Sequence, residues 1–340
     1  MTKDFFKHAA CFTDIHFGNK NNSRQHNIDC EDFVEWFIEQ AKDRGCETCI
    51  FLGDWHHHRS SVNASTLNYS VSNFEKLSAA FDDIYVIVGN HDLYYREKRE
   101  INSFPYARTF KNIHIISDEI IERDGVALVP WLVEDEWKQM KKIKARYVFG
   151  HFELPHFMMN MVVAMPDHGT LRSDHFEKPE YVFSGHFHKR QARDNIHYLG
   201  SPFPHNYADA WDDQRGAMFL RWDGKPVYVN YEGPRYITIN LSDLIDNPEQ
   251  YLNSKTYCRA TLDVPISYEE ANFIKETFMA QFEPRELSLM PTKKDELSID
   301  PAQDGEFVVE SVDQIVYNQL GAVDSDVISS DLLIQIYKDL

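Results

Sequence analysis

The sequence predicts an α/β protein, and two observations lead to this prediction. Apolar runs rich in β-branched residues, suited to buried strands, alternate with amphipathic stretches of helical period. With 340 residues, 43% of them hydrophobic, the chain can form one large domain and a smaller one. No apolar run reaches the length of a membrane span, so no transmembrane segment is expected.

The first ninety residues are typical of a β-α-β-α-β unit. Strands are expected at residues 8–13, 48–52 and 84–88, and helices at residues 29–45 and 65–81. The strand at residues 84–88 is an Ile-Tyr-Val-Ile-Val run that a glycine ends. Ligands of α/β sheets bind beyond the carboxyl ends of the strands, so the residues that follow each strand are the candidates for function.

The rest of the chain predicts more strands and a second module. Further strands are expected at residues 113–117, 126–130, 147–149, 181–184, 196–199, 217–222 and 227–231, with a helix at 134–144 and a loop or lid at 153–175. Strands at 236–241, 257–264 and 286–290 and helices at 242–252 and 268–282 suggest a small α/β module. The predicted domains are therefore residues 1–233 and 234–290, a polar linker at 291–305, and a segment at 306–340 with two amphipathic helical stripes.

The charge of the chain restricts how it could bind a polyanion. There are 54 acidic and 35 basic side chains, a net charge of −19, which excludes a uniformly basic nucleic-acid coat. A nucleic acid would have to bind through bound cations or local basic groups. The candidates follow predicted strand ends, although each also fits an ordinary solvated charge: Arg59, Arg96, Lys98, Arg99, Lys189, Arg190 and Arg193.

The five cysteines indicate a reducing environment. Their number is odd and no signal-peptide pattern precedes them, so free thiols in the cytoplasm are expected. Cys46 and Cys49 form a Cys-x-x-Cys motif, but the sequence has no second pair. Core packing is therefore predicted for both, rather than a zinc or redox site.

Metal-type side chains follow five of the predicted strands. A single histidine at a strand end is an ordinary polar residue, but a set from five strands is a ligand pattern. Carboxylates, imidazoles and one amide suit two divalent transition metals such as manganese, iron or zinc better than calcium. Two such ions about 3.5–4 Å apart can hold both sides of a phosphoryl group. The set is Asp14, His16, Asp54, Asn90, His151, His186 and His188.

In this order the residues resemble the signature blocks of calcineurin-like metallophosphoesterases. The blocks are Asp14-x-His16, Gly53-Asp54, Gly89-Asn90-His91-Asp92, Gly150-His151 and Gly185-His186-x-His188, within residues 8–230. The resemblance implies a four-layer α-β-β-α sandwich. It assigns Asp14, His16 and His188 to a first metal and Asn90, His151 and His186 to a second, with Asp54 bridging them. It also implies that His91 is the general acid that protonates the leaving oxygen and that Asp92 orients it.

The residues after the bridging aspartate are similar to those of Mre11/SbcD nucleases. His57 stands three residues after Asp54, and Arg59 follows it. The resemblance implies that His57 helps to place a phosphodiester, while which of His56, His57 and His58 faces the site stays open. Protein phosphatases of the superfamily carry Asp-Arg-Gly at this point, which this chain lacks.

The second module and the chain terminus extend the resemblance. The module is similar to the capping domain of such nucleases, and the terminal stripes resemble those of small phage recombination endonuclease subunits. The resemblance implies that the substrate is DNA and that the protein binds two divalent ions. Mn²⁺ is the first choice for these ions, and Mg²⁺, Fe²⁺ and Zn²⁺ are the alternatives. The resemblance also implies a homodimer and a location in the cytoplasm, which is that of the host cell if the protein is phage-encoded. The C-terminal helices would bind a Rad50/SbcC-like ATPase; a hairpin folded back on its own domain is the alternative for them.

The function predicted from the sequence is a metal-dependent endo- or exodeoxyribonuclease subunit in recombination, repair and end processing. A small-molecule or cyclic-nucleotide phosphodiesterase, or a phosphatase, is the alternative enzyme class. A non-enzymatic scaffold that holds metals is the alternative outside enzymes.

Overall fold

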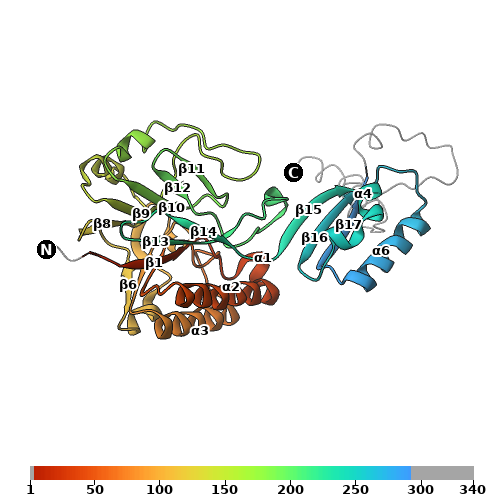
Figure 1. The fold of residues 1–340 in the computed structure, drawn as a ribbon, viewed down its shortest axis with the longest axis horizontal. Helices are drawn as coiled ribbons and strands as arrows, with labels where there is room; N and C mark the ends of the chain where they lie inside the picture. The colour runs from red at the N-terminus through yellow and green to blue at the C-terminus, as the bar shows by residue number, and fades with distance from the viewer. Residues whose placement is uncertain (1–3, 292–340) are drawn as a thin grey trace, which may run out of the picture. The chain divides into compact units, whose positions relative to one another are not determined.

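The computed structural model describes residues 4–291, which belong to two compact units (Figure 1). The first unit ends at Ile237 and the second begins at Thr238. The predicted terminal helices, and the predicted linker apart from Pro291, lie outside the described residues.

The first unit contains a six-stranded sheet that carries the predicted β-α-β-α-β pattern. Its order is β14-β13-β1-β2-β3-β6. Strands β1, β2, β3 and β6 are parallel, and β13 runs antiparallel to both of its neighbours, β1 and β14. The strands are β1 (His8–Phe12), β2 (Thr48–Phe51), β3 (Asp83–Ile87), β6 (Ile113–Ile116), β13 (Gly216–Arg221) and β14 (Val227–Asn230).

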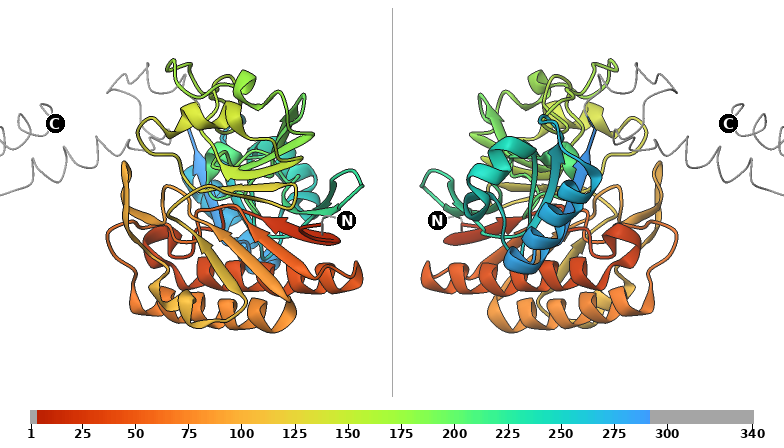
Figure 2. Two further views of the ribbon diagram at one scale, coloured as in Figure 1. Left: turned by 90° about the vertical axis from the view of Figure 1, so that its left-hand side faces the viewer. Right: turned by 90° about the vertical axis from the view of Figure 1, so that its right-hand side faces the viewer.

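Two helices cover one face of this sheet, α2 (Arg24–Asp43) and α3 (Ala64–Ala80) (Figure 2). The rings of Phe33 and Phe37 on α2 pack against Phe12 of β1, with centroids 5.5 and 4.6 Å apart. Helix α2 begins five residues before the predicted start because the Ser23 side chain caps it, accepting a hydrogen bond from a backbone N–H of the first turn.

A second six-stranded sheet packs on the other face of the first. Its order is β11-β12-β10-β9-β8-β7, with parallel central strands and an antiparallel strand at each edge. Apolar side chains such as Cys11, Leu52, Leu128 and Phe149 form the core between the sheets. The strands are β7 (Ile121–Arg123), β8 (Val126–Val129), β9 (Tyr147–His151), β10 (Tyr181–Gly185), β11 (Gln191–Arg193) and β12 (Ile196–Tyr198).

Short 3₁₀ helices rather than long α-helices cover the outer face of the second sheet. The predicted helix at residues 134–144 is the 3₁₀ helix η2 (Glu136–Lys142), and η3 (Ser173–Phe176) lies near it. Met140 and Phe176 from these segments pack in a third apolar cluster with Val148 and Val182 of the sheet. The mixed α/β class is confirmed, and its fourth layer is thin in this chain.

The remaining elements of the first unit are short. They are α1 (Asn19–Asn22), the hairpin β4 (Leu93–Tyr95) with β5 (Lys98–Asn102), η1 (Pro105–Thr109) and η4 (Tyr207–Asp209). The loop predicted at residues 153–175 is irregular apart from η3 and one bridge between Met158 and Ala164.

The second unit has a three-stranded sheet in the order β15-β16-β17. Its elements are β15 (Arg235–Asn240), α4 (Leu241–Asp246), α5 (Pro248–Tyr251), β16 (Thr256–Thr261), α6 (Tyr268–Phe282) and β17 (Glu286–Met290). The single helix predicted at residues 242–252 is divided because Pro248 lacks an N–H and drives Asn247 out of the helical region, to φ −143°.

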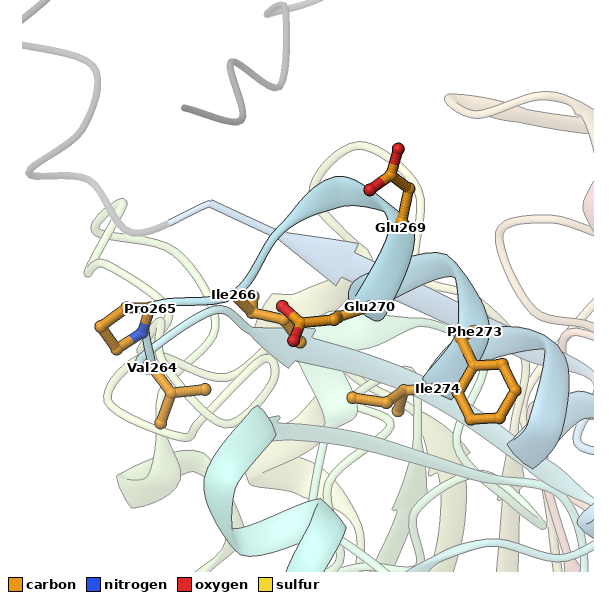
Figure 3. Close-up of a pocket in the computed structure, with 7 residues that line it drawn as sticks. All are labelled: Val264, Pro265, Ile266, Glu269, Glu270, Phe273 and Ile274. Atoms are coloured by element: carbon orange, nitrogen blue, oxygen red, sulfur yellow. The ribbon is translucent and has the colours of Figure 1, made fainter. Parts of the chain in front are cut away.

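A pocket in the second unit lies beside the start of α6 and is lined mainly by apolar side chains (Figure 3). The carboxylate of Glu270 accepts hydrogen bonds from the backbone N–H and hydroxyl of Ser267, as part of the α6 cap. The pocket therefore does not present a free pair of carboxylates. Its lining residues are Val264, Pro265, Ile266, Glu269, Glu270, Phe273 and Ile274.

All five cysteines are buried free thiols, so the prediction of core packing for Cys46 and Cys49 is confirmed. Within residues 4–291, no helix combines the length and the apolar character needed to cross a membrane.

Candidate metal centre

The carboxyl ends of the central strands of both sheets meet, and glycine permits their close approach. A Cβ atom on Gly53, whose φ is +101°, would lie 2.4 Å from the Nδ1 atom of His151. A Cβ atom on Gly185 would lie 2.1 Å from the Thr13 hydroxyl and 2.6 Å from the Leu52 carbonyl oxygen. The glycines beside the predicted ligands therefore let one sheet pack directly against the other.

Several of the predicted ligands have a left-handed backbone, which is rare for residues other than glycine. The φ angles of Asp14, His16, Asp54 and His186 are 51°, 53°, 62° and 86°. Strained backbone of this kind concentrates at functional sites, where the surrounding structure holds it in place. The strain therefore supports a functional role for these strand ends.

The first predicted donor set comes together from β1 and the residues after β10. The Nε2 atom of His16 lies 3.2 Å from that of His188 and 4.0 Å from Asp14 Oδ1. The Asp14 carboxylate also accepts hydrogen bonds from Thr13 Oγ1, at 2.7 Å, and from the backbone N–H of His186, at 3.1 Å.

The second predicted donor set gathers around the amide oxygen of Asn90. This oxygen lies 3.1 Å from His151 Nε2 and 3.0 Å from His186 Nδ1. The other ring nitrogen of His151 lies 2.7 Å from the Leu52 carbonyl oxygen, which holds a proton on Nδ1 and directs Nε2 toward Asn90 and Asp54.

Asp54 lies between the two sets. Its Oδ2 atom is 3.8 Å from His16 Nε2 and 3.3 Å from His151 Nε2. Two ligand atoms about 2.1 Å from one tetrahedral ion are about 3.4 Å apart, so these spacings fit divalent metal binding. All seven predicted ligands thus lie in one cluster, and the carboxylate predicted to bridge lies within 4 Å of a nitrogen from each set.

The electrostatics of the cluster also suit a cation. Burial, followed by neighbouring histidines, lowers the pKa of His16 well below its usual value, so its ring is neutral at pH 7. Burial raises the pKa of Asp14 to about 7. Burial acts against the charged form of Asp54 too, but His151 outweighs it and lowers the pKa of Asp54. Burial acts against the charged form of His151 as well, but Asp54 outweighs it and raises the pKa of His151 to about 9. Neutral imidazoles and ionised carboxylates are the forms that bind metal, so a cation would have to displace a proton from the His151 ring.

His91 and His57 lie beside the first set. The His91 backbone N–H donates to Asp54 Oδ1 at 2.8 Å, and its Nδ1 lies 2.6 Å from the carbonyl oxygen of His57. The two rings are stacked with centroids 5.5 Å apart, and one ring nitrogen from each groups with one of His16. His56 instead directs both ring nitrogens to Ser103 and Ser70.

Asp92, predicted to orient His91, contacts backbone N–H groups instead of the His91 ring. Its carboxylate accepts four backbone N–H groups, from Gly89 and from three consecutive residues after β2: Asp54, Trp55 and His56. Asp92 therefore fixes the turn that carries Asp54. The His57 carbonyl, not the Asp92 carboxylate, contacts the His91 ring.

Sequence reasoning missed several residues at the centre. Glu153 Oε1 lies 3.5 Å from His186 Nε2, and both of its oxygens lie 3.2 Å from Arg96. The Trp131 ring lies 5.2 Å from that of His186. Glu153 follows His151 by two residues, a spacing that could have drawn notice, whereas Trp131 follows a strand that releases no other metal-type side chain.

The loop after β12 also contributes residues that the sequence did not indicate. His205 is buried, and one of its ring nitrogens groups with those of His16 and His188. Arg215, fully buried, contacts Asp209 and Asp212 at 3.2 and 2.8 Å and donates to the His188 carbonyl.

Comparison with known families identifies the family of the fold. The model of the calcineurin-like phosphoesterase family matches residues 8–190, more than half of the chain. The chain belongs to this family. Family members use divalent metal ions, and the two donor sets described above are candidate sites for such ions in this phosphoesterase.

Individual relatives include nucleases and a phosphatase. The phosphoesterase is 25% identical over 310 residues to exonuclease subunit 1 of Enterobacteria phage T4, covering 88% of each chain. A Pseudomonas putida nuclease is 19% identical, with a TM-score of 0.30, over 56% of this chain and 66% of that chain. A Danio rerio dimetal phosphatase is 10% identical, with a TM-score of 0.41, over 67% of this chain and 96% of that chain.

Proposed function

We propose that this phosphoesterase is a metal-dependent DNA nuclease, the catalytic subunit of a complex with a Rad50/SbcC-like ATPase. It cleaves phosphodiester bonds during recombination, repair and end processing, as a homodimer that uses two divalent ions, Mn²⁺ first among them. Its similarity to a phage protein named exonuclease subunit 1, over 88% of both chains, supports the choice of nuclease within the family.

The position of Asp54 is the observation that carries this proposal. A single carboxylate oxygen lies within 4 Å of a nitrogen from each donor set, so two cations could share it. Asp14, His16 and His188 would hold one ion, and Asn90, His151 and His186 the other. When bound, the ions would supply positive charge that attracts a phosphodiester and activates water.

His91 is suited to protonate the leaving oxygen. Its Nδ1 proton is held by the His57 carbonyl, which leaves Nε2 to carry and release a second proton. The stacked ring of His57 has an Nδ1 atom without a hydrogen-bond partner among the described residues, so it can donate to a phosphate oxygen. His57 would thereby position the diester, and His91 would complete its cleavage.

Purified protein with Mn²⁺ should cleave linear duplex DNA, and the ATPase partner should raise the rate. The same protein should be compared on bis-p-nitrophenyl phosphate, which reports phosphodiester hydrolysis without DNA recognition. Turnover of the small ester with intact DNA, even with the ATPase present, would reject the nuclease and favour the small-molecule phosphodiesterase.

The ATPase is proposed to bind residues 306–340, whose apolar stripes suit an amphipathic helix in a hydrophobic groove. In the full chain, Leu332→Asp should abolish ATPase capture while metal content and small-ester turnover stay unchanged. Gln335→Asp, which adds the same charge outside the apolar stripe, is the matched control. Equal capture by both variants would show that residues 306–340 are not the docking segment.

A further inference from the structure

His205 lies in the metal centre without a role among the predicted ligands. It is 2% exposed and comes from the loop between β12 and η4. One ring nitrogen each of His16, His188 and His205 lie within 4.8 Å of one another. The His205 ring centroid is 5.4 Å from that of His16 and 5.0 Å from that of His188.

The hydrogen bonds of His205 determine which nitrogen can bind a cation. Its Nε2 atom lies 3.0 Å from the backbone carbonyl oxygen of Asp14, which only accepts hydrogen bonds, so Nε2 carries a proton. In the neutral ring the lone pair is then on Nδ1. That atom is buried and has no hydrogen-bond partner within residues 4–291. A buried, unpartnered polar atom is unfavourable unless it binds something absent from the protein itself.

The surrounding loop holds His205 and His188 together. The backbone N–H of His205 donates to Asp209 Oδ2 at 3.2 Å, and the other oxygen of Asp209 pairs with Arg215, also at 3.2 Å. Arg215 donates in turn to the carbonyl of His188. One buried arginine thus positions both imidazoles beside His16.

We propose that His205 is a further metal ligand, which binds the first-site cation through Nδ1 as a third imidazole beside His16 and His188. This inference depends on the metal centre and not on DNA as the substrate. A third imidazole should raise the affinity of the first site for transition metals relative to Mg²⁺, which prefers oxygen ligands.

Two substitutions separate ligation from positioning. In His205→Gln the side-chain amide can still donate to the Asp14 carbonyl but offers no nitrogen lone pair, whereas His205→Phe removes both functions. Both variants should bind Co²⁺ at one of two sites about 10- to 100-fold more weakly than the original protein, by calorimetry. The matched control is His197→Gln, in β12, whose ring contacts Tyr228 outside the cluster.

A count of ligated imidazoles tests the proposal without any variant. In NMR spectra of the Co²⁺-loaded protein, ring N–H signals with the large contact shifts of directly bound imidazoles should come from five rings: His16, His151, His186, His188 and His205. Four such signals, or His205→Gln binding Co²⁺ as tightly as the original protein, would overturn the proposal. Affinity lost only in His205→Phe would likewise overturn it, because His205 would then merely position Asp14.

Discussion

At the scale of single residues, backbone carbonyls set the proton positions of the histidines in the centre. His151 Nδ1 lies 2.7 Å from the Leu52 carbonyl and His91 Nδ1 lies 2.6 Å from the His57 carbonyl. A carbonyl can only accept, so in each ring it leaves Nε2 as the working atom. The chemistry of the site therefore depends on main-chain positions that substitution of a neighbouring side chain does not remove.

Replacement of His91 tests its proposed role as general acid. His91→Asn should lower phosphodiester cleavage about 10²- to 10⁴-fold, because no group remains to protonate the leaving oxygen. Metal content, measured by elemental analysis, should not change, since His91 is not a predicted ligand. His114→Asn, at a histidine 39% exposed that pairs with Asp83, is the control. Full activity in His91→Asn would rule out the general-acid role, and loss of metal-dependent cleavage would rule out a passive scaffold.

His56 gives the fold a defined sensitivity to acid. Burial lowers the pKa of His56 to about 3, whereas a histidine in the unfolded chain titrates near 6.5. Between these values the unfolded chain binds a proton that the folded protein excludes, so stability falls as the pH falls below about 6.5. In His56→Gln the side chain does not titrate, so this loss of stability is absent. Between pH 7 and pH 5 the free energy of unfolding should fall about 2 kcal/mol less in the variant than in the original protein, by urea denaturation. Equal losses would show that His56 is protonated in the folded state.

At the scale of elements, four of the five strand ends combine a glycine with a predicted ligand. The glycine lets the strand approach its neighbours, and the residues after it carry the metal-type side chains. Asp92 adds a second structural constraint, because its four N–H contacts tie the end of β3 to the turn after β2. The glycines and the Asp92 contacts together position Asp54 against the second sheet.

Gly185 shows how strictly this packing is limited. In Gly185→Ala the new methyl group would meet the Thr13 hydroxyl at 2.1 Å and the Leu52 carbonyl at 2.6 Å, and a backbone atom cannot move aside easily. The variant should lose about 1–3 kcal/mol of stability and bind metal more weakly, because His186 follows directly. Thermal unfolding and calorimetry with Mn²⁺ measure both effects. The control is Gly224→Ala, where the nearest atom is 3.2 Å away on Arg221. Equal behaviour of the two variants would contradict this account.

At the scale of the whole molecule, the candidate metal centre lies between two sheets that otherwise meet through an apolar core. Asp14, His16 and Asp54 follow strands of the first sheet, and His151 and His186 belong to the end of the second. Bound cations would therefore link the sheets, and metal binding would contribute to the stability of the first unit.

Removal of metal should therefore lower the unfolding temperature of the first unit. At a free metal concentration a hundred times Kd, each site would contribute about 2.7 kcal/mol of stability. Calorimetry with and without EDTA measures the change. In Asp54→Asn, which lacks the proposed bridging carboxylate, chelation should have a much smaller effect. An unfolding temperature that is the same with and without EDTA would show that metal does not link the sheets.

Local sequence patterns were sufficient to predict most of the fold. The strands at residues 8–13, 48–52 and 84–88 and helix α6 lie close to where the hydrophobic periodicity predicts them. The helix at residues 134–144 is 3₁₀, and the helix at 242–252 is divided, because a proline and the demands of packing on the sheet override periodicity.

The sequence by itself predicted which seven side chains gather in one cluster, because ligands bind beyond the carboxyl ends of the strands of α/β sheets. Only the tertiary structure decided that His57 rather than His56 faces the centre, that Asp92 holds a turn, and that His205 and Glu153 stand among the ligands. These contacts join residues separated by up to about two hundred positions, and local sequence carries no information on which loops of the two sheets meet.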